Sequence, residues 1–165
     1  LAVPNLIRAN RNKRLIESGR EIVQVLHEAR FKAVADNSSK NVQINTTNNT
    51  IQTSKGTVIT LPAGIHFKTL DNSVEPPAQV QDAVSKVGAL VTQKDDPQTF
   101  TSLPNTAVSG VYLAEFNSKG LPKVEPGVVN WIYLENEEGQ LAAIILTSGG
   151  ASDIVQYNSQ TKTWK

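Results

Sequence analysis

The sequence predicts an α+β fold in which one long N-terminal helix packs against antiparallel β-sheet. Apolar residues follow a helical spacing across 5–36, and no proline interrupts that stretch. After residue 40 apolar residues alternate with polar ones, as they do in half-buried strands. Asn and Thr are abundant, which favours short strands joined by turns. A chain of 165 residues suits one domain with its own buried core.

The helix expected over 5–36 lies in an N-terminal stalk (residues 1–36), and residues 37–165 form a β-rich head. Only Gly19 interrupts the helical pattern. Residues 8–14 are mostly polar and a helix of this length spans roughly 48 Å, so we expect its front end to project. The Asn- and Ser-rich stretch at 35–41 should end the helix. The face expected to pack against the head consists of Leu15, Ile22, Leu26, Ala29 and Ala33.

The head is predicted to begin with a meander of four short strands joined by hairpin turns. Their sequences are NVQINT, TIQTS, VITLP and GIHFKTL. Residues 71–97 break this rhythm as an insertion, with a short helix predicted near 78–87. The last third returns to strands. These are QTFTSL, GVYLAEF, the hairpin of VVNWIYLEN and QLAAIILTS, and a strand beginning IVQY that turns at NSQTK into a terminal strand.

Charge is divided unevenly along the chain, although the net charge is only +1. Residues 1–40 hold eight Lys and Arg against four Asp and Glu, whereas residues 41–165 hold eight against eleven. A basic segment beside an apolar start favours an anionic partner or a lipid surface. The opening LAV is an unusual start for a soluble protein. We therefore expect that a signal was removed, or that a longer apolar segment precedes it.

No set of residues in the sequence has the pattern of a catalytic, cofactor-binding or metal site. There is no Cys, no GxSxG motif occurs, and His27 and His66 have no acidic neighbour at metal-ligand spacing. We therefore expect no enzymatic activity and no cofactor. The ENEEG turn at 135–139 could take calcium through its carboxylates, but it lacks the ligand alternation of a calcium loop. A solvated turn is the stronger interpretation.

Two segments have features that bind nucleic acid in other proteins. One is the basic start of the helix, and the other is the C-terminal TKTWK, where Trp164 lies between Lys162 and Lys165. Lysines beside an aromatic ring can hold a single strand through charge and stacking. The alternative is that Trp164 closes the core from the last strand.

The stretch AVPNLIRA resembles type IV pilins and type II secretion pseudopilins, in which a long apolar helix continues into a soluble head. Four residues match the A-x-P-x-L-x-x-A pattern of that family, namely Ala2, Pro4, Leu6 and Ala9. The resemblance covers both ends of the chain better than its middle, because residues 71–97 have no clear counterpart.

Two further segments are similar to the minor pseudopilin H/FimT group of that family. One is VLHEARFKAVADNSSKNVQI, which resembles the helix end and first strand through Leu26, Ala29, Arg30, Ala33 and Val42. The other is LAAIILTSGGASDIVQYNSQTKTW, which looks like the group's ending. It departs from the group at one turn, which often contains Gly-Arg but here reads Gly149-Gly150-Ala151.

The resemblance implies a pilin-like fold, with the helix on two antiparallel sheets, and a structural role. Such subunits are anchored in the inner membrane with the head in the periplasm. A prepilin peptidase cleaves and methylates them, and they assemble through their helices into a filament. We expect a minor pilin or pseudopilin that starts or caps a type IV pilus or type II secretion filament. The alternative is a pilin-like binding module whose head recognises DNA during uptake or a secreted substrate.

On this interpretation the partners are other subunits and, before assembly, the membrane surface. Basic side chains at the front of the helix could meet lipid phosphates or acidic groups of neighbouring heads. The alternative is a solvated basic face. The candidate contact residues are Pro4, Leu6, Arg8, Arg11, Lys13 and Arg14.

Overall fold

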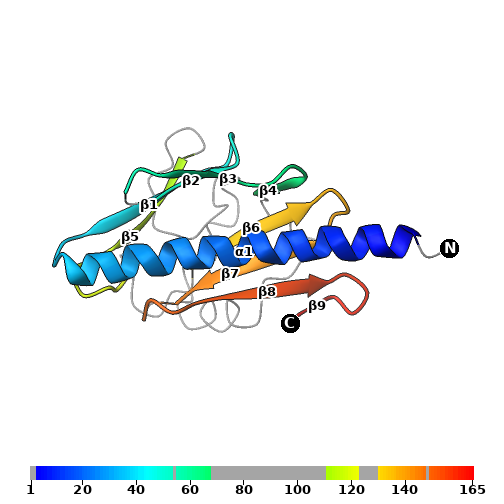
Figure 1. Ribbon diagram of the computed structural model, residues 1–165. Coiled ribbons are helices and arrows are strands. Elements are labelled where there is room, and N and C mark those ends of the chain that lie inside the picture. Colours follow the sequence, from blue (N-terminus) through cyan, green and yellow to red (C-terminus); the bar gives the residue numbers. More distant parts are fainter. Residues whose placement is uncertain (1–2, 54, 68–110, 123–129, 148) are drawn as a thin grey trace.

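A computed structural model describes residues 3–53, 55–67, 111–122, 130–147 and 149–165 (Figure 1). The insertion at 71–97, its expected helix and the expected strand QTFTSL lie outside these residues. The described elements are a helix, α1 (Val3–Ala35), and the strands β1 (Lys40–Asn45), β2 (Thr50–Gln52), β3 (Val58–Thr60), β4 (Ile65–Phe67), β5 (Val111–Phe116), β6 (Asn130–Asn136), β7 (Leu141–Leu146), β8 (Ser152–Asn158) and β9 (Thr163–Trp164).

Helix α1 begins two residues earlier than the sequence predicts and ends one residue earlier. Pro4 lies in its first turn, where proline is tolerated because the missing N–H would have no acceptor within the helix. The chain leaves the helix at Asn37, two residues after Ala35, where Asn37 adopts a left-handed φ of 46°. The N–H groups of Asn37 and Ser38 donate to the carbonyl oxygens of Val34 (3.2 Å) and Ala33 (3.1 Å). This pair of hydrogen bonds is the Schellman motif, so Asn37 is the residue that stops α1.

The head contains two antiparallel sheets, with strand orders β3-β2-β1-β5 and β4-β6-β7-β8-β9. Together with α1 they form the predicted α+β arrangement. The prediction of one four-stranded meander is wrong for its last strand, because β4 pairs with β6 and places Phe67 opposite Leu134. Pro62 has no N–H to continue the ladder beyond β3. The carbonyl of Gly64 then accepts the N–H of Glu137 at 3.1 Å, which holds the chain beside the second sheet.

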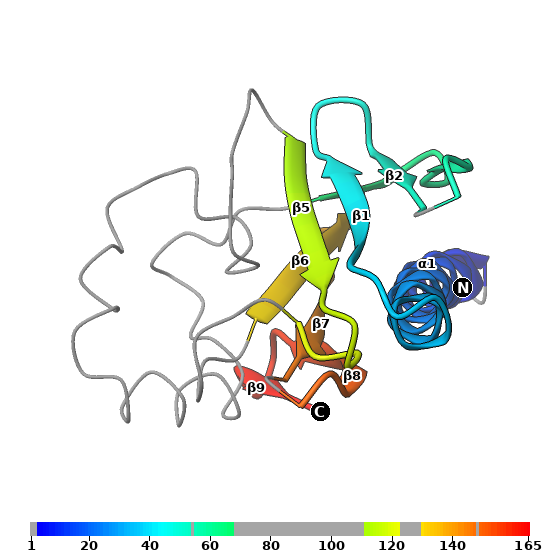
Figure 2. The same ribbon diagram turned by 90° about the vertical axis from the view of Figure 1, so that its left-hand side faces the viewer.

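Helix α1 contacts strands of both sheets. Figure 1 shows it crossing in front of them, and Figure 2, which looks along the helix, shows it to one side of the strands. Its packing-face residues Leu15, Ile22, Leu26, Ala29 and Ala33 are each at most 1% exposed and belong to one core with β1, β6 and β7. Every residue of β7 is buried. The rear of α1 is therefore part of the core of the head.

Gly19 is a close-packing position in α1 and not a weak point in the helix. A Cβ built on it would lie 2.0 Å from Cδ1 of Ile154 and 3.9 Å from Cγ1 of Ile144. The missing side chain therefore lets β8 approach the helix. The preceding residue, Ser18, is also buried.

Arg30 joins the rear of α1 to turns that follow strands of both sheets. Its Nη1 donates a hydrogen bond of 3.0 Å to the carbonyl oxygen of Gly150, in the turn between β7 and β8. Gly120, in the turn after β5, lies against the same side chain. A Cβ on Gly150 would lie 2.8 Å from the carbonyl oxygen of Gly120 and 3.0 Å from Nε of Arg30. Close packing against Gly120 and Arg30 therefore requires a residue without a side chain at Gly150, the second glycine of this turn.

Candidate functional site

The front of α1 carries the exposed side chains that the sequence indicates as contacts. Figure 1 shows this end of the helix reaching beyond the strands. Ile7 is 48% exposed, and Arg8 and Arg14 are also exposed. The side chains of Pro4 and Leu6 lie outside the described structure. The front therefore presents apolar and basic groups together.

Two of the four basic residues at the front are engaged within the chain. Arg11 forms ion pairs with Glu137 (3.4 Å) and Glu138, both in the turn between β6 and β7. Lys13 pairs with Glu17 one helical turn away, at 3.6 Å. These pairs are exposed and contribute little to stability. Arg11 nevertheless brings the head into contact with the helix before Leu15, so the free part of α1 is shorter than predicted.

The other two basic residues are available for a partner. For Arg8 and Arg14 the described residues provide no ion pair. An exposed arginine without an internal partner keeps its guanidinium donors free for a carboxylate or a phosphate. Of the predicted contact residues, these two have the clearest capacity to bind another molecule.

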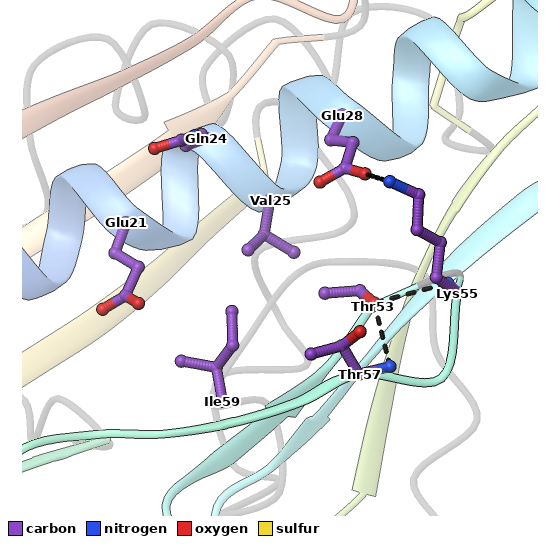
Figure 3. A pocket seen from close by; sticks show the side chains of 8 residues that line it. All are labelled: Glu21, Gln24, Val25, Glu28, Thr53, Lys55, Thr57 and Ile59. Atoms are coloured by element: carbon purple, nitrogen blue, oxygen red, sulfur yellow. Dashed lines mark hydrogen bonds and ion pairs between the residues drawn. The ribbon is translucent and has the colours of Figure 1, made fainter.

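A groove of about 220 Å³ lies between α1 and the β2–β3 hairpin. Figure 3 shows Val25 and Ile59 facing each other across it, with Glu21 extending from the helix on the same side as Val25. Sequence reasoning missed this groove, because its two walls are about 30 residues apart and no motif links them. The lining residues are Glu21, Gln24, Val25, Glu28, Thr53, Lys55, Thr57 and Ile59.

An ion pair between Glu28 and Lys55 crosses one end of the groove (Figure 3). The hydrogen bond from Lys55 and its positive charge hold the pKa of Glu28 below its ordinary value. The hairpin turn places Lys55, since Oγ1 of Thr53 accepts the N–H groups of Lys55 (3.3 Å) and Thr57 (3.2 Å). Glu21 has no ion-pair partner among the described residues.

Replacing Lys55 with Gln should raise the pKa of Glu28 towards its ordinary value, because it removes the positive charge and replaces the ammonium hydrogen bond with at most a neutral one. A lowered carboxyl pKa means that the pair stabilises the fold at neutral pH and that this contribution is lost as the pH falls through the pKa of Glu28. NMR titration of the Glu28 carboxyl would measure the change. Asp36 is the internal control, because Lys40 lowers its pKa and the substitution leaves that pair intact. An unchanged Glu28 titration would show that Lys55 is not the cause.

Contacts within the chain hold the three C-terminal candidates for nucleic-acid binding, Lys162, Trp164 and Lys165. The ring of Trp164 lies 5.1 Å from that of Tyr157 and 5.9 Å from that of Tyr133, measured between centroids, and packs against the core. Lys165 pairs through its backbone with Gln156, at 2.7 and 2.9 Å. Lys162 lies in the preceding turn with φ at 52°. The tyrosines occupy part of the ring surface that a base would need for stacking.

The histidine and carboxylates of the second sheet form contacts that sequence spacing could not reveal. Nε2 of His66 lies 3.1 Å from a carboxylate oxygen of Glu135, its cross-strand partner. Oδ1 of Asn136 accepts the N–H of Glu138 at 3.0 Å and shapes the turn considered for calcium. In the described ranges no group of three or more His, Asp or Glu residues could hold a metal ion.

An exposed apolar patch lies at the opposite end of α1 from its basic front. Phe31 is 74% exposed, and Val34, one turn further on, is also exposed. Leu121 is exposed too, and follows Gly120, which lies against Val34. The sequence pattern gives this patch no role, because residue spacing cannot show which apolar side chains the head leaves uncovered.

Comparison with known proteins identifies no relative of this chain, so its function has to be argued from the sequence and the structure. No family model, curated protein or solved structure matches the chain. Within the part of the chain that the structure describes, no helix has the apolar length needed to cross a lipid bilayer. The observations that bear on function are the free front of α1, the groove beside it and the resemblance of the helix sequence.

Proposed function

We propose that this chain is a structural subunit, a minor pilin or pseudopilin, of a type IV pilus or type II secretion filament. The observation that carries the proposal is the division of α1. Its rear packs on both sheets, while its front extends with Ile7, Arg8 and Arg14 exposed. A helix divided in this way fixes the head at one end and offers the other end to a second molecule.

The resemblance of AVPNLIRA to the family supports the same proposal, because it falls on the front of α1. On this proposal the helix belongs to a longer apolar helix that anchors the subunit in the inner membrane, with the head in the periplasm. Assembly then moves the helices from lipid into contact with other subunits. The free arginines would face lipid phosphates in the first state and acidic groups of other subunits in the second.

Assembly has more support than ligand capture by the head. The candidate for DNA stacking, Trp164, has Tyr133 and Tyr157 against its ring. By contrast, Arg8 and Arg14 lie on a helix that reaches beyond the head (Figure 1). We therefore propose a filament subunit as the primary role and keep DNA binding as an alternative.

Deletion of the gene tests this function in the organism that encodes the chain. We expect loss of at least one filament-dependent activity, namely protein secretion, twitching motility or transformation. The full-length gene supplied in trans should restore it. If all three activities are unaffected in organisms shown to have them, the proposed function is wrong. A defect in transformation alone, together with salt-dependent DNA binding by the purified chain, would favour the DNA-binding alternative.

A further inference from the structure

The front of α1 and the groove beside α1 carry opposite charge at different levels of the same helix. Arg8 and Arg14 are exposed cations without an ion pair in the described structure. Glu21 is likewise an exposed anion without an ion pair in the described structure, and Glu28 is paired with Lys55. One chain therefore holds both halves of a complementary surface, but they are too far apart on one straight helix to meet.

The two charge pairs have similar spacings along the helix axis. Six residues separate Arg8 from Arg14, and seven separate Glu21 from Glu28. At 1.5 Å per residue these are axial distances of about 9 and about 10.5 Å. Ile7 lies seven residues before Arg14 and so on nearly the same face of the helix. That face combines an exposed apolar side chain with a cation.

The groove has the matching composition. Its floor is apolar, formed by Val25 and Ile59, and the neighbouring Val58 is exposed. Its helix wall carries Glu21 and Glu28, and Lys55 of the hairpin pairs with Glu28 at one end, so the net charge of the groove is negative (Figure 3). A surface that is apolar in the middle and acidic along one wall suits a segment that is apolar with basic side chains.

We propose that the groove between α1 and the β2–β3 hairpin receives the front of α1 from a second copy of this chain. Arg14 of the second copy lies against Glu28, Arg8 lies against Glu21, and Ile7 lies at the Glu21 end of the groove floor. The inference rests on the proposed function, since subunits anchored at the same end of their helices are parallel.

This contact displaces the two copies along the helix axis. Glu28 lies fourteen residues beyond Arg14, so the displacement is about 21 Å. A displaced contact joins different surfaces on the two copies. One copy keeps a free front and the other keeps a free groove, so the contact can repeat in an open chain.

The contact is expected to be weak between isolated copies. It relies on ion pairs at an exposed surface, which salt screens over a Debye length of about 10 Å at 0.1 M. Holding both copies by their helices on one membrane or filament would raise their effective concentration. Self-association in solution should therefore need low salt and high protein concentration.

Cysteine cross-linking tests the contact on the chain as it stands, because it contains no native Cys. Asn10 and Gln24 are exposed, uncharged and fourteen residues apart, so the proposed displacement brings Asn10 of one copy level with Gln24 of the other. A mixture of Asn10→Cys and Gln24→Cys copies, treated with a short thiol cross-linker at low salt, should give dimers. Lys119→Cys, at an exposed turn position, replaces Gln24→Cys as the matched control and should give only background.

Charge reversal links any cross-link to the proposed ion pairs. Arg8→Glu in the Asn10→Cys copy, or Glu21→Arg in the Gln24→Cys copy, should lower the dimer yield about tenfold, and combining them should restore it. Neither side chain has an internal ion pair in the described structure, so the fold should be unaffected, as circular dichroism would verify.

The double variant Asn10→Cys/Gln24→Cys distinguishes an open chain from a closed dimer. The proposal predicts a ladder of oligomers, because each copy keeps one unused surface. Products that stop at dimers would show an antiparallel, closed contact, and yields no higher than the Lys119→Cys control would exclude the contact. Either result would overturn this inference while leaving the proposed function to the deletion experiment.

Discussion

The variant Leu26→Ala should lose about 3 kcal/mol of unfolding free energy, measured by urea denaturation. Leu26 is 1% exposed and lies at the middle of the helix face that packs on the head. Truncation removes buried methyl groups and leaves a cavity that the flanking strands cannot fully close. Because the same face joins α1 to both sheets, the loss should loosen the helix from the head.

Phe31→Ala is the matched control for Leu26→Ala. It removes a larger side chain from the same helix, but Phe31 is 74% exposed. Its effect should stay within about 0.5 kcal/mol. Equal losses from the two variants would contradict the assignment of the buried face of α1.

Gly150→Ala should lose about 3 kcal/mol of unfolding free energy, for two separate reasons. Gly150 has a left-handed φ of 81°, which costs an L-residue about 1–2 kcal/mol. Its new Cβ would also lie 2.8 Å from the backbone oxygen of Gly120, which no side-chain rotation can relieve. The turn would have to move, and the hydrogen bond from Arg30 to the carbonyl of Gly150 would move with it.

Gly139→Ala separates these two causes. Gly139 has a similar φ of 70°, but a Cβ built there would meet no atom within 4 Å. This control should therefore lose only the conformational part, about 1 kcal/mol. If chemical denaturation gave the same loss for both variants, close packing between the turns and Arg30 would not stabilise this fold.

The helix could be predicted closely because its determinants are local. An uninterrupted apolar spacing fixes the buried face, and polar residues after Ala35 end the helix. The helix is stopped by the left-handed conformation of Asn37. The Asn- and Ser-rich composition of this stretch predicts that the helix ends there, but not which residue adopts that conformation. The helix starts at Val3, two residues before the predicted start, because proline is compatible with both sides of a helix start.

The strand that changes sheets could not be predicted from local pattern. GIHFKTL alternates like its predecessors, and nothing in its spacing indicates that β4 pairs with β6, about 70 residues away. The choice depends on the sheet edge that the chain meets after Pro62. The same limit applies to the ion pairs of Arg11 and the groove beside α1, which join residues distant in sequence. Periodicity indicates which face is buried, whereas topology decides what lies against it.

The packing of α1 fixes the direction in which its exposed front extends from the head. Leu26, Gly19 and Arg30 fix the rear of the helix to strands and turns of the head. The front then keeps a defined direction relative to the head, although few of its own side chains are buried. A rigid connection of this kind suits a subunit whose head must be placed at a fixed position along a filament.

Processing of the full-length protein tests the central claim, membership of a pilin-type filament, most directly. Antibodies raised against the purified chain would detect it in the parent strain and in a strain lacking the prepilin peptidase, and mass spectrometry would define its N-terminus. We expect a shortened protein with a methylated N-terminus in the parent strain and a longer, unmethylated precursor in the mutant. The same size and the same unmethylated N-terminus in both strains would contradict the account.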